Sequence, residues 1–98
     1  MNTTVVDIDK IKEKVLPVLK EAGVTRSAIF GSYALGENTK DSDVDILIEP
    51  PESMTLFGFA GLKLKLEEVL GQKVDLVEYS AIKPRIKQQL LSTQIPIL

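Results

Sequence analysis

The sequence predicts a single α/β domain of the α+β kind, in which helices pack on a small mixed β-sheet. In two long segments, apolar residues recur at spacings of three and four, which is typical of amphipathic helices. Short apolar or alternating runs that end at glycine or proline lie between and after these segments, and they indicate strands. No repeat, low-complexity tract or linker divides the 98 residues, so residues 1–98 are expected to form one domain with one core.

The first expected element is a helix that begins at Ile8 and stops at Gly23. Its apolar positions share one face and are separated by charged residues; they are Ile8, Ile11, Val15, Val18 and Leu19. Pro17 lies inside this pattern, and a proline removes a backbone donor and crowds the preceding turn. We therefore expect a kink or a division of the helix at Pro17.

Two strands are expected next, at residues 27–30 and 44–48. The first follows Val24, is apolar from residue 28 and leads into a turn at Gly31. The second ends before Pro50 and Pro51, which cannot continue a ladder of backbone hydrogen bonds. Both strands are apolar enough to be buried.

The second half of the chain continues with a helix at residues 56–70 that Gly71 ends. Its expected buried side consists of Leu56, Phe59, Leu62, Leu66, Val69 and Leu70. An alternating strand follows at residues 73–78, then a short helix at residues 83–91 after Pro84, and an edge strand at residues 95–98.

The charge balance and the missing residue types exclude several functions. With 12 basic and 14 acidic side chains the net charge is −2, so no broad positive field exists to bind an extended nucleic acid. Cysteine and histidine are both absent, which excludes disulfides, thiolate zinc sites and imidazole-based triads. Carboxylates remain as proton acceptors and as ligands, and oxygen ligands favour Mg²⁺ or Mn²⁺.

The first residues do not form a signal peptide, and no apolar run approaches the roughly 20 residues of a membrane span. A cytoplasmic location without membrane attachment is the expectation.

Three aspartates are the candidate metal ligands. Asp43 and Asp45 are two residues apart at a strand start, so their side chains project to the same side with Cα atoms roughly 7 Å apart. Two such carboxylates repel each other unless a cation or a proton lies between them. Asp75 is the candidate third ligand, because it is flanked by apolar residues in a strand that can lie beside the first.

Two other interpretations of the acidic cluster remain open at this point. One is an acidic loop that caps a strand and has no further role. The other is a calcium loop, because acids occur at positions 1, 3, 5 and 12 counted from Asp41. Position 6, which needs glycine, is however Ile46, and Pro50 and Pro51 precede the supposed last ligand, Glu52. A calcium site is therefore disfavoured.

Gly31 and Ser32 directly follow a predicted strand and are candidates for binding phosphate. A glycine lets phosphate approach the backbone, the serine hydroxyl can donate to phosphate oxygens, and a short helical turn after them would add its positive end. A plain hairpin turn is the common alternative. The segment lacks the endings of a Walker loop and the glycine spacing of a dinucleotide fingerprint.

Taken together, these motifs resemble those of the minimal nucleotidyltransferases of the DNA polymerase beta superfamily. The resemblance rests on Gly31-Ser32-Tyr33-Ala34-Leu35-Gly36, then Asp41-Ser42-Asp43-Val44-Asp45, and then Lys73-Val74-Asp75. It covers nearly the whole chain and implies the polymerase beta-like palm fold. It also implies a nucleotidyltransferase that uses two Mg²⁺ ions, with Mn²⁺ as a substitute.

The resemblance further implies a role for each site residue. Gly31 and Ser32 would hold the triphosphate of ATP, and Asp43 and Asp45 would ligate the two metal ions. Asp75 would ligate one ion and help to deprotonate the attacking hydroxyl. Members of the family often carry arginine where this chain has Leu35, so one cation for phosphate is missing.

The resemblance implies a protein partner as well. The minimal family members typically act as antitoxins of a HEPN-type RNase toxin and adenylylate a tyrosine on it, which predicts a hetero-oligomer. The basic segment at residues 83–87 and the apolar tail at residues 95–98 could dock such a partner, although packing of the tail into its own core is favoured. The alternatives are a non-catalytic antitoxin that blocks its partner by binding alone, and a plain interaction domain.

Overall fold

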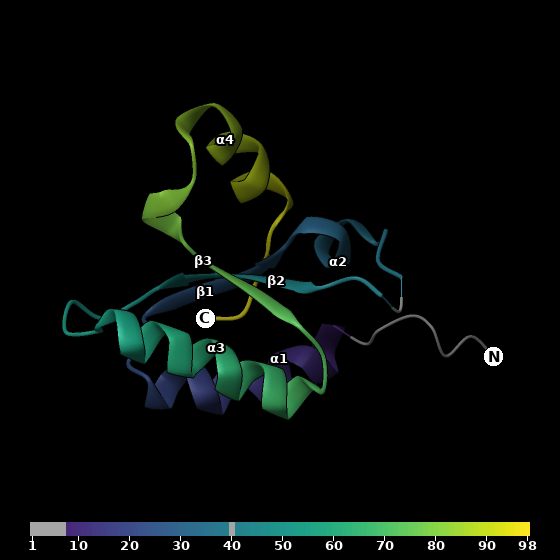
Figure 1. The fold of residues 1–98 in the computed structure, drawn as a ribbon. Helices are drawn as coiled ribbons and strands as arrows, with labels where there is room; N and C mark the ends of the chain where they lie inside the picture. Colours follow the sequence, from purple (N-terminus) through teal and green to yellow (C-terminus); the bar gives the residue numbers. More distant parts are fainter. Residues whose placement is uncertain (1–7, 40) are drawn as a thin grey trace.

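The computed structural model describes residues 8–39 and 41–98. A four-stranded mixed sheet runs through the molecule in the order β3-β2-β1-β4 (Figure 1). Its long strands are β1 (Arg26–Phe30), β2 (Val44–Glu49) and β3 (Val74–Glu78), and β4 (Ile95–Pro96) is short. β1 pairs antiparallel with β2, and β2 pairs parallel with β3, so the predicted mixed sheet is confirmed.

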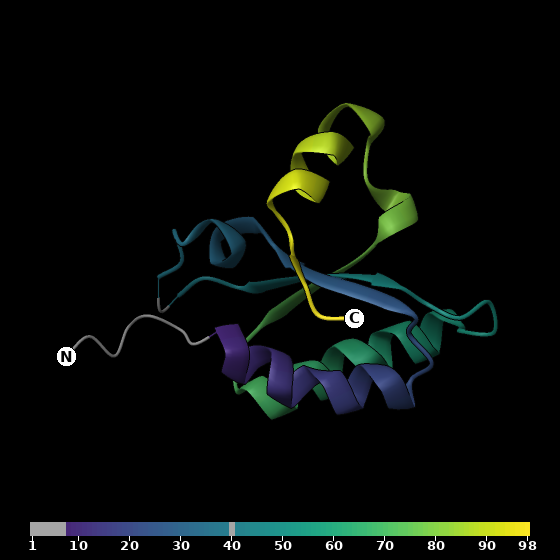
Figure 2. The same cartoon turned by 180° about the vertical axis from the view of Figure 1, so that it is seen from behind.

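Two long helices, α1 (Ile8–Glu21) and α3 (Leu56–Leu70), cover one face of the sheet (Figures 1 and 2). α1 runs through Pro17 as one helix, so of the two outcomes expected there, a kink or a division, the division does not occur. Thr55 begins α3 by accepting a hydrogen bond from the Gly58 backbone N–H at 3.0 Å.

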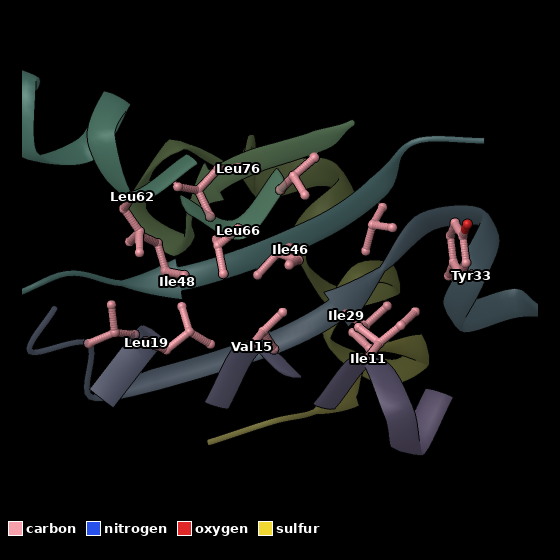
Figure 3. Close-up of a cluster of buried hydrophobic side chains, with 13 residues drawn as sticks. Ile11, Val15, Leu19, Ile29, Tyr33, Ile46, Ile48, Leu62, Leu66 and Leu76 are labelled. Carbon is pink, nitrogen blue, oxygen red and sulfur yellow. The ribbon is translucent and has the colours of Figure 1, made fainter. Parts of the chain in front are cut away.

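The main core lies between these two helices and the sheet (Figure 3). Ile46 and Ile48 of β2 are fully buried in it, together with Val15 and Leu66 from the helices. One expected core residue of α3 is misplaced, because Leu56 is 85% exposed. Met54, just before the helix, packs against the core instead, so the buried face of α3 begins only at Phe59.

The opposite face of the sheet carries less cover. It is covered by a 3₁₀ turn, η1 (Tyr79–Ala81), and by α4 (Pro84–Thr93), which together with Ile82 close a small second cluster around Leu47 (Figures 1 and 2). A five-residue helix, α2 (Gly31–Leu35), follows β1 directly.

The C-terminal tail forms part of the sheet. β4 (Ile95–Pro96) pairs antiparallel with β1, and Leu98 exchanges backbone hydrogen bonds with Ser27. Ile95, Ile97 and Leu98 pack against the main core, as the sequence favoured. Among the described helices, none has the length and apolar character needed to cross a membrane.

Candidate active site

Two of the predicted aspartates lie side by side on neighbouring strands. Asp45 of β2 and Asp75 of β3 are register partners in the parallel pair, one residue after each strand begins. Because side chains alternate along a strand, both project to the α4 face, opposite to Ile46. The expectation that the strand of Asp75 lies beside that of Asp45 is confirmed.

Asp43 lies just before β2 and is exposed. It is close enough to Asp45 for its charge to raise the pKa of that carboxyl. Within residues 8–39 and 41–98, however, no three carboxyl groups already meet around a single point. The structure therefore brings Asp45 and Asp75 together and leaves Asp43 at the edge of the pair.

The environment of Asp45 disfavours its charged form. Its pKa is raised from 3.8 to about 6, first by burial, then by the charges of Asp75 and Asp43, and last by a hydrogen bond with Asp75. In the described part of the chain, no lysine or arginine forms an ion pair with any of these three aspartates. The negative charge is left for a ligand to balance.

This donor set fits a magnesium ion that also binds phosphate. Mg²⁺ is usually held by one or two carboxylates, with water and substrate phosphate oxygens completing an octahedron. Asp45 and Asp75 supply two adjacent carboxylates, and Asp43 is close enough for its charge to act on Asp45. A cage made of protein ligands alone is not required for such an ion.

Gly31 brings the backbone against Asp45. It has φ +72°, a left-handed conformation that other residues rarely adopt, and it joins β1 to α2. A Cβ at this position would overlap Asp45 Oδ2 and lie 3.0 Å from Asp45 Cγ. The structure thus explains why residue 31 is a glycine in two ways, by its left-handed φ and by the lack of room for a Cβ beside Asp45. The turn leads from a strand into a helix, so it is not a hairpin turn.

Ser32 follows in the first turn of α2 and is half-buried. Its carbonyl accepts the Glu37 backbone N–H at 2.8 Å, which closes the helix at Gly36. Leu35 on the same helix is 52% exposed. The predicted phosphate-binding role of Ser32 stays a prediction, and the position of Leu35 offers no cation to assist it.

Two contacts that position the site had not been predicted from the sequence. Gln72 Nε2 donates to Tyr33 Oη at 2.5 Å, which ties α2 to the turn before β3. Glu67 accepts the Val74 backbone N–H at 3.0 Å and also binds Lys63, and both contacts lower the pKa of Glu67. The Gln72–Tyr33 and Glu67–Val74 contacts join different elements, so no local pattern could have indicated them, whereas Lys63 and Glu67 are four residues apart on α3.

A third feature without a sequence signal is a cavity beside Asp75. It has a volume of about 420 Å³ and lies between the sheet and the segment of η1 and α4. The basic residues Lys83 and Arg85 belong to its lining, as does Asp75 itself. A larger cavity of about 500 Å³ lies elsewhere, between α1 and α3, and contains none of the predicted site residues.

Paired aspartates on adjacent strands, with one of them against a glycine turn that leads into a short helix, are the arrangement expected from the resemblance to enzymes that transfer nucleotidyl groups. The sequence model of the nucleotidyltransferase domain family matches residues 8–95. The chain therefore belongs to this family and is a nucleotidyltransferase.

Curated relatives are similar over most of this chain. A candidate protein adenylyltransferase of Methanocaldococcus jannaschii is 44% identical over 92 residues, which are 94% of this chain and 99% of the relative. The protein adenylyltransferase MntA of Thermococcus cleftensis is 45% identical over 69 residues, which are 70% of each chain.

Solved structures agree with the fold. One described as a candidate minimal nucleotidyltransferase is 38% identical, with a TM-score of 0.82 and coverage of 97% of both chains. A chain from the complex of a tri-AMPylated HEPN toxin of Shewanella oneidensis with an MNT antitoxin has a TM-score of 0.70. It is 21% identical, with coverage of 92% of this chain and 71% of that one, and this likeness shows the shared fold alone.

Proposed function

We propose that this chain is a Mg²⁺-dependent protein adenylyltransferase that transfers AMP from ATP to a tyrosine hydroxyl of a HEPN-type RNase toxin, and thereby acts as its antitoxin. One observation carries the proposal: Asp45 and Asp75 lie side by side, with Asp45 against the Gly31 backbone, the pKa of Asp45 raised and no ion pair from the described cations. The names of the relatives support a protein as the acceptor.

In this proposal, Asp43 and Asp45 ligate two Mg²⁺ ions and Asp75 ligates one of them. Gly31 and Ser32 hold the triphosphate, since the absence of a side chain at Gly31 lets this turn lie directly against Asp45 and so beside the metal ligands. When bound, the ions neutralise charge on the attacking and leaving oxygens.

The acceptor oxygen forms a bond to the α-phosphorus of ATP. The bond between that phosphorus and the oxygen bridging to the β-phosphate breaks, and pyrophosphate leaves with the electron pair. The hydroxyl proton passes to the carboxylate of Asp75, and from there to water. Asp75 can take this role because it is exposed, whereas Asp45 is more deeply buried in the pair.

The assignment of a HEPN-type toxin as the partner depends most on the similar solved structures. The HEPN toxin and its AMPylation are features of the Shewanella complex, and the minimal nucleotidyltransferase resemblance is what extends them to this chain. A hetero-oligomer of this chain with such a toxin follows from the proposal.

Incubation of the purified chain with ATP labelled at the α-phosphate, Mg²⁺ and its HEPN-type partner tests the function. We expect label on the partner, loss of its RNase activity, and loss of the label when the accepting tyrosine is changed to phenylalanine. The double variant Asp43→Asn with Asp45→Asn should transfer no measurable label, while Asp41→Asn, an exposed acid of the same segment, should match the wild type.

The alternative is an antitoxin that blocks its partner by binding alone, which the exposed Leu35 in place of a cation favours. In that case the wild type forms a tight, inhibited complex without label, and the double variant inhibits equally well. Labelling that persists in the double variant would instead contradict the assigned residues.

A further inference from the structure

The cavity beside Asp75 has apolar walls and exposed basic residues at its rim. Phe30, Ile82, Ile86 and Leu90 give it apolar walls, and Asp75 lies in its lining. Lys83 and Arg85 are exposed, and within the described residues neither of them forms an ion pair. An apolar hollow with a carboxylate and two cations is thus attached directly to the aspartate pair.

Resting on the proposed function, we infer that this cavity receives the aromatic side chain that becomes adenylylated, and that Lys83 and Arg85 select an acidic segment around it. An aromatic ring buries a large apolar area and carries its hydroxyl at the far end. With the ring against Phe30 and Ile82, that hydroxyl can lie near Asp75. A serine or threonine side chain would leave these walls unfilled.

The order of the strands favours the acceptor over the nucleotide as the occupant. Across the sheet, Asp45 lies between Gly31 at the end of β1 and Asp75 on β3. In an in-line transfer the acceptor and the leaving pyrophosphate lie on opposite sides of the phosphorus. Since Gly31 and Ser32 are assigned to the phosphates, the acceptor belongs on the side of Asp75. The cavity reaches that side through Asp75 and Val77 of β3, and it extends across the sheet to Phe30 of β1.

The charges also favour an acidic acceptor segment. Residues 37–54 carry six acids and one lysine, so this part of the chain would repel an acidic segment and cannot be the surface that binds it. The three cations of residues 80–98 are Lys83, Arg85 and Lys87, and the first two line the cavity. Complementary charges at a rim steer association and fix orientation.

A matched pair of charge reversals on α4 tests the rim. Arg85→Glu should raise the KM for the HEPN-type partner by roughly tenfold, because it replaces an attraction by a repulsion of similar size. Lys87→Glu makes the same charge change on the same helix outside the cavity lining, and it should alter this KM less than about twofold. The dissociation constant of AMP-PNP with Mg²⁺ should stay unchanged in both variants.

A second pair tests the walls. Ile86 is 43% exposed, so Ile86→Glu can place a carboxylate in the cavity without emptying the core, and Gln88→Glu is the exposed control on α4. The probe is a short synthetic peptide with one tyrosine flanked by glutamates, titrated into the full chain and followed by NMR. We expect shifts of the Ile82 and Leu90 methyl groups in the wild type and in Gln88→Glu, and none in Ile86→Glu.

Three results would overturn the inference. In the first, AMP-PNP shifts the Ile82 and Leu90 methyl groups and Ile86→Glu weakens its binding, so that the nucleobase occupies the cavity. In the second, the peptide causes no shift there, or a lysine-flanked peptide binds equally well. In the third, Arg85→Glu and Lys87→Glu have the same KM for the partner. The proposed function is judged separately, by whether transfer to the partner requires Asp43 and Asp45.

Discussion

The two faces of the sheet differ in what covers them and in what they contain. The face under α1 and α3 is closed by a continuous core of buried apolar side chains, in which Ile46 and Ile48 are inaccessible. The face under α4 has only the small cluster around Leu47, beside the carboxyl pair and a cavity. One face stabilises the domain, and the other leaves groups free for a ligand.

The side chains of one strand, β2, alternate between these two faces. Along β2, Asp45 and Leu47 point to the α4 face, while Ile46 and Ile48 point to the helices. A shift of the register by one residue would exchange the two sets and bury the carboxyl group in the main core. The core therefore holds the aspartates in place without touching a ligand, and substitutions on the two faces should have separable effects.

The largest effect is expected from Asp75→Asn on the site face. Loss of the carboxylate removes a metal ligand and the proposed proton acceptor, so the rate of AMP transfer should fall by roughly a thousandfold, or about 4 kcal/mol in activation free energy. Asp41→Asn should retain the wild-type rate. The measurement is single-turnover labelling of the partner; a loss below about tenfold would mean that Asp75 does not act on the reaction.

Ile46→Ala, on the core face, is expected to affect stability rather than the rate of AMP transfer. This truncation of a fully buried side chain should lower the free energy of unfolding by about 3 kcal/mol. Val77→Ala, on the half-buried site face, should lower it by about 1 kcal/mol. Urea unfolding measures both; comparable losses would contradict the proposed division between the faces.

The fold was largely predictable because its elements leave local patterns. The periodicities that predicted α1 and α3, and the glycine and proline signals that ended the strands, depend on neighbours in the sequence. The failures have physical reasons: Leu56 has the correct helical spacing, but the core does not extend to the first turn of α3. Pro17 is exposed, and the helix continues through it.

The candidate site was predictable only in part. Asp75 could be proposed as a partner of Asp45 because apolar residues flank it in a strand that could lie beside that of Asp45, and the structure places the two residues in register. The link between Tyr33 and Gln72 and the cavity between β3 and α4 depend on how distant segments pack, so the sequence carries no local signal for them. The metal and nucleotide roles of the five site residues stay predictions.

A smaller effect is expected from the charge of Asp45 in the absence of metal. Its pKa in the folded protein, about 6, lies above the unfolded value near 3.9, so the folded state loses stability as the pH rises between these two values. The whole shift corresponds to about 3 kcal/mol, and solvent screening of the half-exposed carboxyl reduces this. At pH 8 without metal, Asp45→Asn should therefore be more stable than the wild type by about 1–2 kcal/mol, and at pH 3 by nearly nothing.

Magnesium should reverse this difference. Mg²⁺ balances the charge of the pair, so it should raise the melting temperature of the wild type more at pH 8 than at pH 5, and should barely change that of Asp45→Asn. Melting curves at the two pH values, with Mg²⁺ and with EDTA, measure both effects. A metal-induced shift of equal size in the variant would place the ion elsewhere.

The smallest effect is expected from Tyr33→Phe, which connects the two faces. Tyr33 packs its ring into the main core and accepts a hydrogen bond from Gln72, so it fixes α2 relative to the start of β3. Removal of the hydroxyl should cost about 1 kcal/mol of stability.

If the bond also positions Gly31 and Ser32 against Asp75, the KM for ATP should rise by a few fold in Tyr33→Phe, after correction for the change in melting temperature. Gln72→Ala should then produce the same rise, and the double variant no more than either single one, because both remove one shared interaction. Additive effects on this KM would mean that the two side chains act independently.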